Sequence, residues 1–245
     1  MKAALPLLFC CVASAQTPDM QQITALAKTY FRDSAELPMN VSFTKKITRP
    51  DGTLQRQRHA NLTMLFHGYR QNGGMTVSAT GGIFQRGVTL DSMSADFAAF
   101  AAGRILLKKD DTAYFDVRPR PQAGDSFLVT IEDTGHPPFK LISDRVLFPP
   151  ERSFCGTATF TLSGNPASGP HFTHFTWTAS NLPANATIAD LGSVQILTYK
   201  IDEDFQTRNL RGETTPFVLP KTVHIQVATD KGQIDITDEY TPQEK

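Results

Sequence analysis

The first regular pattern of apolar and polar residues predicts a helix near the N-terminus. Thr17-Pro18-Asp19 has the features of a helix start: a capping hydroxyl, a proline in the first turn, and an acid near the positive end of the helix dipole. The apolar residues that follow recur at helical spacing and form one stripe; they are Met20, Ile23, Leu26, Ala27, Tyr30 and Phe31. We therefore predict an amphipathic helix over Asp19 to Asp33, whose stripe needs an apolar surface to cover.

Beyond Pro38 the apolar residues recur at every second position, which is typical of β-strands with one buried face. One turn is predicted at Pro50-Asp51-Gly52-Thr53, and another at Asp230-Lys231-Gly232 between the last two strands. The clearest alternation lies in the C-terminal half of the chain, at Phe160, Leu162, Phe175, Trp177, Val223, Ile225, Val227, Ile234 and Ile236. Polar residues occupy the intervening positions, so we expect a sheet with one buried face and one solvent-exposed face.

These two patterns together predict a mainly β protein. Its strands should form a strongly curved antiparallel sheet, and the N-terminal helix should pack on the concave face, because one apolar stripe and several one-sided strands can bury each other. We expect residues 16–245 to form a single β-rich domain. A domain boundary near Pro149 is the weaker alternative, and a separate subdomain over residues 87–150 is left open.

The N-terminal residues 1–15 have the features of a secretion signal. Lys2 supplies the positive start, residues 5–12 form a short apolar run, and Ala13-Ser14-Ala15 offers small residues to signal peptidase. The run is too short to span a bilayer, so we expect cleavage, export to the periplasm or the exterior, and no transmembrane segment. Cleavage leaves Cys155 as the only cysteine and therefore no internal disulfide. Lipidation of Cys11 is the alternative, although the bulky residues before it differ from those of lipoprotein signals.

The charge of the chain argues against nucleic acid as a partner. The charges of its 24 basic and 24 acidic residues cancel, and the sequence contains no stripe of basic residues. A local basic group, which includes Lys45, Arg56 and Arg58, falls on a predicted hairpin, and we interpret it as a solvated strand face. The acidic run Asp202-Glu203-Asp204 is interpreted similarly, as a solvated strand end.

The sequence offers no assembled catalytic or metal site, and we expect neither an enzyme nor a cofactor. No serine lies in a Gly-x-Ser-x-Gly turn, and Ser42 and Lys45, three positions apart on a predicted strand, should point to opposite faces. His171 and His174 should diverge for the same reason. Cys155 stands alone at the start of a strand, where a small packed hydrophobe is the ordinary role of a cysteine.

The aromatic content has two interpretations, and the order of the elements resembles that of a known family. The chain holds 17 phenylalanines, which suit either a bulky packed core or an apolar cavity. An exported chain that opens with one amphipathic helix, continues in long antiparallel strands, and reaches its last strand pair through Phe217-Val218-Leu219-Pro220-Lys221 resembles the LolA-like lipoprotein-carrier superfamily. The resemblance implies a half-open β-barrel lidded by helices, with an apolar lining and no catalytic residue.

We therefore expect an exported, non-enzymatic binding protein that carries a lipid or another apolar ligand in the cell envelope. In a half-barrel covered by a helix, the apolar faces of the helix and of the strands are turned toward one another, so we expect them to line a ligand cavity. The expected ligand-binding residues are Ile23, Leu26, Tyr30, Phe31, Phe160, Leu162, Phe175, Trp177, Val223, Ile225, Val227, Ile234 and Ile236. The alternative is a secreted β-rich structural or interaction protein with a packed core and no ligand. A protein partner in the envelope is compatible with either function.

Overall fold

Strands make up nearly all of the chain that the computed structural model describes. The described residues are 37–66, 75–78, 115–121, 126–133, 156–163, 171–180, 184–188, 190–209 and 217–243, together with Gln21, Ala25 and Leu182. The strands within these ranges are β1 (Leu37–Thr48), β2 (Leu54–Phe66), β3 (Met75–Ser78), β4 (Phe115–Pro121), β5 (Ser126–Asp133), β6 (Gly156–Ser163), β7 (His171–Ala179), β8 (Ala186–Ile188), β9 (Gly192–Val194), β10 (Ile196–Arg208), β11 (Phe217–Thr229) and β12 (Gly232–Pro242).

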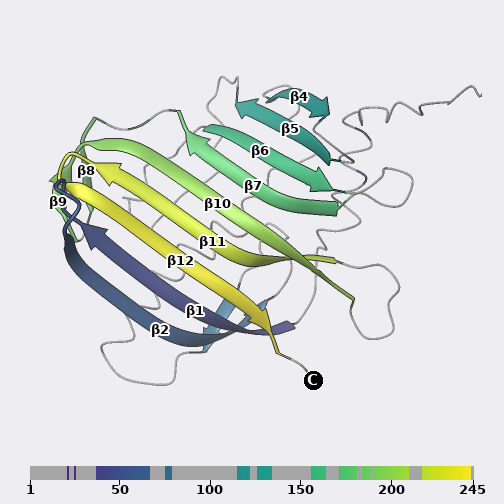
Figure 1. Cartoon of the computed structure of the whole chain (residues 1–245), viewed down its shortest axis with the longest axis horizontal. Helices are drawn as coiled ribbons and strands as arrows, with labels where there is room; N and C mark the ends of the chain where they lie inside the picture. Colours follow the sequence, from purple (N-terminus) through teal and green to yellow (C-terminus); the bar gives the residue numbers. More distant parts are fainter. Residues whose placement is uncertain are drawn as a thin grey trace, which may run out of the picture.

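These strands form one large antiparallel sheet and one small one (Figure 1). The large sheet has ten strands in the order β3-β2-β1-β12-β11-β10-β7-β6-β5-β4, and β8 pairs only with β9 among the described strands. Because β1 pairs with β12, the hairpins from the two ends of the chain join into one continuous sheet. The prediction of mainly antiparallel β structure is confirmed for the described residues, in the form of an open sheet with β3 and β4 at its edges.

The predicted N-terminal helix and secretion signal lie outside the described residues, apart from two positions. Gln21 and Ala25 are helical and exposed. The helix over residues 19–33, its packing on the sheet, the signal and the single-domain organisation therefore stay predictions. In the described part of the chain, no helix has the length and apolar character needed to cross a bilayer.

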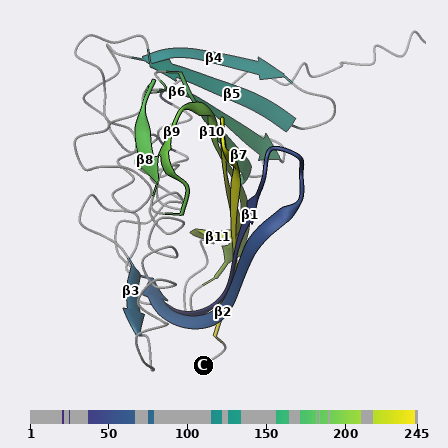
Figure 2. The ribbon, with the colours of Figure 1, turned by 90° about the vertical axis from the view of Figure 1, so that its left-hand side faces the viewer.

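The large sheet is strongly curved, and β2 bends toward the side on which β8 and β9 lie (Figure 2). Several strands are 12 or 13 residues long, and long paired strands accumulate right-handed twist. Register shifts add local bends, among them those at Ile47/Thr48, at Thr161/Leu162 and at Asp204/Phe205. The sheet therefore has a concave face, on the side of β8 and β9, and a convex face.

The two predicted turns close the hairpins β1–β2 and β11–β12. In the first turn the Thr53 backbone N–H donates to Asp51 Oδ1 at 2.9 Å, and Gly52 has a φ of +83°, in the left-handed region. In the second turn Gly232 has a φ of +139°, and a Cβ atom there would overlap the carbonyl oxygen of Thr48. Glycine is therefore required where the β11–β12 turn approaches the end of β1.

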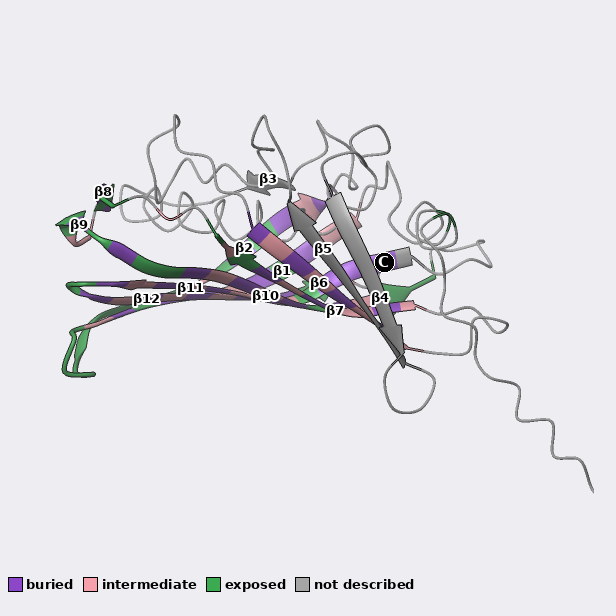
Figure 3. Ribbon diagram, turned by 90° about the horizontal axis from the view of Figure 1, so that it is seen from above, coloured by how far each residue is buried: buried purple, intermediate pink, exposed green. Residues whose placement is uncertain are grey.

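Successive side chains in a strand point to opposite faces, and buried positions alternate with more exposed ones along strands such as β6 and β7 (Figure 3). The buried side chains form one hydrophobic core, which includes residues of β8 and β9 and so lies on the concave side. Burial at every second residue is cleanest along β6. Ile188 of β8 and Val194 of β9 belong to the same buried cluster as the strands of the large sheet. The largest fully buried side chains are Trp177, Tyr199, Phe43, Phe66, Phe160, Phe172 and Phe175. Each buried phenylalanine contributes about 1.5–3 kcal/mol through burial, so this face contributes strongly to the stability of the described sheet.

Candidate functional site

The concave face brings together the strand residues that were expected to line a ligand site. Each is 0% exposed: Phe160 and Leu162 on β6, Phe175 and Trp177 on β7, Val223, Ile225 and Val227 on β11, and Ile234 and Ile236 on β12. The helix residues of the expected lining lie outside the described residues; they are Ile23, Leu26, Tyr30 and Phe31. The strand residues thus share one apolar face, and their contact with a ligand stays a prediction.

Aromatic side chains fill the part of this face formed by β6, β7 and β10. The ring centroids of Phe160 and Phe175 lie 4.9 Å apart, and those of Phe160 and Phe172 lie 6.0 Å apart in an edge-to-face arrangement. Trp177 packs edge-to-face against Tyr199, with centroids 5.4 Å apart. Such pairs add about 0.5–1.5 kcal/mol each to the burial of their rings. This part of the face is therefore a closely packed apolar surface.

The indole of Trp177 lies against Gly156 on the neighbouring strand. A Cβ atom at Gly156 would overlap the Thr178 carbonyl oxygen and would lie 2.7 Å from the indole Nε1. Within the described part of the chain, the buried Nε1–H has no hydrogen-bond partner. A buried indole N–H ordinarily donates to an acceptor, so an unpaired donor at this position is unusual.

Two carboxyl groups interrupt the apolar face, and neither was among the predicted site residues. The first is Glu203 of β10, which is in phase with Ile201 and Phe205 and is 0% exposed. Neither carboxylate oxygen of Glu203 has a hydrogen-bond partner among the described residues. Burial raises the pKa of Glu203 well above its usual value, and the charge of Asp204 raises it further. The interpretation of residues 202–204 as a solvated strand end is therefore wrong for Glu203.

The second carboxyl group is that of Asp238 on β12, in phase with Ile236 and Tyr240. Asp238 is 0% exposed and takes part in a further interaction. Strand pairing places both acids in a single row across the concave face, which runs Phe175, Glu203, Val223, Asp238, Phe43. A signal for both was present in the sequence, because each acid stands on the apolar phase of its strand.

A charged cluster lies on the same face, where β1 and β2 meet the turn between β8 and β9. Lys45 Nζ is 2.7 Å from Asp190 Oδ2, while Arg56 and Arg58 lie 3.1 and 3.7 Å from Asp190 Oδ1. Burial alone would raise the pKa of Asp190, but the hydrogen bond from Lys45 and the three positive charges outweigh it and hold the pKa below its usual value. The interpretation of this basic group as a solvated face is wrong for Lys45, which is buried on the core phase of β1.

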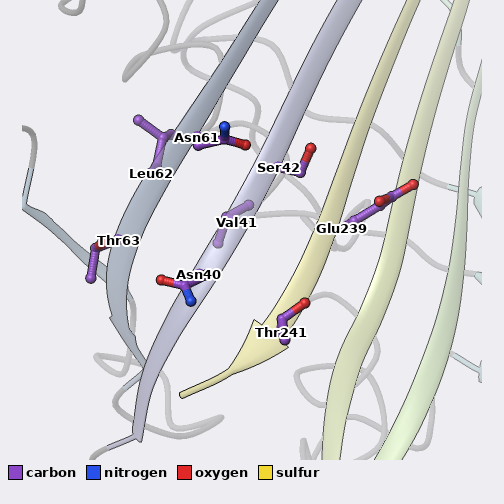
Figure 4. Close-up of a pocket in the computed structure, with 8 residues that line it drawn as sticks. All are labelled: Asn40, Val41, Ser42, Asn61, Leu62, Thr63, Glu239 and Thr241. Carbon is purple, nitrogen blue, oxygen red and sulfur yellow. The ribbon is translucent and has the colours of Figure 1, made fainter. Parts of the chain in front are cut away.

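The convex face is polar and carries a separate open hollow of about 360 Å³ (Figure 4). The residues that line the hollow are Asn40, Val41, Ser42, Asn61, Leu62, Thr63, Glu239 and Thr241. Elsewhere on this face, His174 Nδ1 lies 2.8 Å from Asp204 Oδ1.

Among the residues described, no group of three or more histidine, cysteine or acidic side chains could hold a metal ion. The buried polar atoms therefore make the concave face the stronger candidate site.

Comparison with known proteins finds a structural neighbour but no family. No protein-family model and no curated protein matches the chain. The chain is similar to the crystal structure of a LolA superfamily protein from Nitrosomonas europaea, at 12% sequence identity and a TM-score of 0.37, over 93% of this chain and 92% of that chain. The resemblance expected from the sequence is thus supported only as a weak likeness of fold. At this TM-score the likeness transfers no function to the chain.

Proposed function

We propose that the protein is an exported, non-enzymatic binding protein that carries a lipid or another apolar ligand on the concave face of its sheet. The observation that supports this function is the presence of polar atoms without partners among the buried, mostly apolar side chains of one face. Within the described residues, these atoms are Trp177 Nε1 and both carboxylate oxygens of Glu203.

A fully packed core accounts poorly for these polar atoms. Burying a polar group without a hydrogen bond costs about 1–3 kcal/mol in proteins. That cost is a large share of the total stability of a typical domain, which is about 5–15 kcal/mol. A face that receives a ligand avoids part of the cost, because a polar group of the ligand can pair with the atoms that the protein leaves unpaired. The atoms on Trp177 and Glu203 therefore favour a ligand over a packed core.

The shape of the sheet suits an elongated apolar ligand. Its long strands curve around the concave side (Figure 2). Buried apolar side chains continue across neighbouring strands of the sheet. Burial of hydrocarbon contributes about 0.8 kcal/mol per methylene group, so roughly ten methylenes supply about 8 kcal/mol before the entropic cost of association.

The first test is to purify the protein from its own host and extract it with organic solvent. Mass spectrometry should find a bound lipid in stoichiometric amount. A neutral fluorescent probe, N-phenyl-1-naphthylamine, supplies a second readout, and the emission of Trp177, the only tryptophan, should change when the probe binds. Protein that carries no lipid and binds no probe would instead support a secreted β-rich structural or interaction protein with a packed core.

Ile225→Ala and Leu197→Ala form a matched pair of variants for this test. Ile225 is 0% exposed on the concave face, whereas Leu197 is 51% exposed. Beside a ligand site, Ile225→Ala should change probe affinity and cost less than the about 2–5 kcal/mol typical of a packed core. Leu197→Ala should change neither quantity appreciably. A full core-sized loss of stability in Ile225→Ala, with unchanged probe affinity, would contradict the proposal.

A further inference from the structure

We infer that Glu203, with Asp238 beside it, forms an acidic anchor for a positively charged head group of the ligand. The inference rests on the proposed function, since it needs an apolar ligand on the concave face. It also names the class of that ligand: a long-chain amine, or another lipid that carries an ammonium group. A fatty acid with the same hydrocarbon chain should be disfavoured.

The two acids flank one position of the sheet. β11 lies between β10 and β12, and its residue Val223 pairs with Glu203 on one side and with Asp238 on the other. Neighbouring strands are about 4.8 Å apart, so the backbones of the two acids are separated by about 10 Å. Both side chains belong to the buried phase of their strands. A compact cation above Val223 would therefore be within reach of both carboxyl groups.

The described side chains next to Glu203 provide no hydrogen-bond donor for its carboxyl group. Its neighbours across the sheet are Phe175 and Val223, and the residues in phase with it along β10 are Ile201 and Phe205. None of these side chains has a hydrogen-bond donor. Both oxygens of Glu203 are accordingly buried without a partner in the described part of the chain.

An ammonium group complements this arrangement better than a neutral or an acidic head group does. It brings three N–H donors and a positive charge, whereas an alcohol brings one donor and no charge. Without a ligand, the raised pKa of Glu203 means that its carboxyl group keeps its proton at pH values where an exposed glutamate has already lost it. When an ammonium group binds, the carboxyl group of Glu203 releases its proton to water. The resulting carboxylate then pairs with the positive charge of the ammonium group. A carboxylate head group would instead add a third acid beside Glu203 and Asp238.

Another cation on the same face, Lys45, is already bound. Its Nζ lies 2.7 Å from Asp190, at the turn between β8 and β9. Lys45 pairs with Ile236 of β12, two positions along that strand from Asp238. The Lys45–Asp190 pair therefore lies diagonally next to Asp238 on the concave face, and Glu203 is farther from it, two strands beyond Asp238 on β10.

The test compares three ligands with the same hydrocarbon chain: dodecylamine, dodecanol and dodecanoic acid. Each displaces a neutral fluorescent probe, N-phenyl-1-naphthylamine, from the purified protein below the concentration at which micelles form. The amine should bind about tenfold more tightly than the alcohol, which is the difference expected from one hydrogen bond between charged groups. The acid should bind most weakly.

Glu203→Gln should remove the preference for the amine. Its affinity for dodecylamine should fall about tenfold, while its affinity for dodecanol should stay unchanged. Glu239→Gln is the matched control, because Glu239 is the next residue after Asp238 but is exposed on the convex face. This control should leave all three affinities unchanged. If Glu203→Gln fails to fold, Asp238→Asn should show the same selective loss of amine affinity.

The outcomes distinguish the anchor from the carrier function on which it rests. Equal affinities for the amine and the alcohol in the unaltered protein would overturn the anchor and leave the carrier function in place. Equal losses for all three ligands in Glu203→Gln would do the same, because they would reflect a structural change. Failure of every ligand to bind would overturn the carrier function itself, and the anchor with it.

Discussion

Replacing Asp190 by asparagine should cost about 2–3 kcal/mol of folding free energy at neutral pH. Asp190 binds Lys45 at 2.7 Å and Arg56 at 3.1 Å. A hydrogen bond to a buried charged group contributes about 1.5–3 kcal/mol, whereas the pair with the exposed Arg56 adds about 0–1 kcal/mol. Breaking a fully buried ion pair would cost about 3–5 kcal/mol. The expected loss is smaller, because Lys45 takes part in a further interaction and Arg56 is exposed to water.

The loss should depend on pH, with a sign set by the direction of the Asp190 pKa. In the folded protein this pKa lies below its usual value of 3.8, so the ionised carboxylate favours the folded state. Its contribution is fully present above the pKa of Asp190 in the unfolded chain, and it is lost as the pH falls through the folded pKa. The unaltered protein and Asp190→Asn should therefore differ at pH 7 and converge in strong acid.

Urea unfolding followed by the emission of Trp177 measures both effects. Asp204→Asn is the matched control, because Asp204 lies 2.8 Å from His174 but its side chain is 58% exposed. The control should cost less than about 1 kcal/mol. A loss in Asp190→Asn no larger than in Asp204→Asn, or a loss that persists unchanged in strong acid, would refute the reasoning.

Three further predictions concern buried positions. Glu203→Leu should raise the free energy of unfolding by about 1–3 kcal/mol at pH 7. Because burial raises the pKa of Glu203, the part of its penalty that is linked to ionisation is absent below the unfolded pKa near 4.5. The gain should therefore shrink in urea unfolding as the pH falls toward that value, down to the cost of the unpaired neutral group. Gly232→Ala should lower stability by about 1–3 kcal/mol or more in thermal unfolding, since its Cβ atom would overlap the Thr48 carbonyl oxygen. Gly156→Ala should displace the indole of Trp177 and shift its emission maximum; an unchanged spectrum would contradict the packing described here.

The buried face of the sheet could be predicted from short stretches of sequence. Val223, Ile225 and Val227 stand two positions apart, and slipping the strand by one residue would turn all three toward solvent. All the strand residues that were expected to face inward are 0% exposed. The turns were predictable for a similarly local reason, because Asp51-Gly52 combines a side-chain acceptor with a residue that tolerates positive φ.

The charged residues of the face could not be placed in this way. Lys45 stands on the same phase as Phe43 and Ile47, but periodicity cannot show whether a lysine there is solvated or paired. Its partner Asp190 is 145 residues away along the chain. Burial of Lys45 is tolerable because that carboxylate arrives from the β8–β9 turn, and this depends on the path of the whole chain.

Which side chains share a face of each strand follows from the sequence alone, because successive side chains in a strand point to opposite sides. Which strands are neighbours emerges only in the folded sheet, where Glu203, Val223 and Asp238 lie in one row across β10, β11 and β12. Strand order depends on which arrangement of the whole sheet buries the most apolar surface and pairs the most backbone groups. A local sequence pattern does not report these interactions between distant segments. The proximity of the two acids is therefore visible only in the assembled sheet.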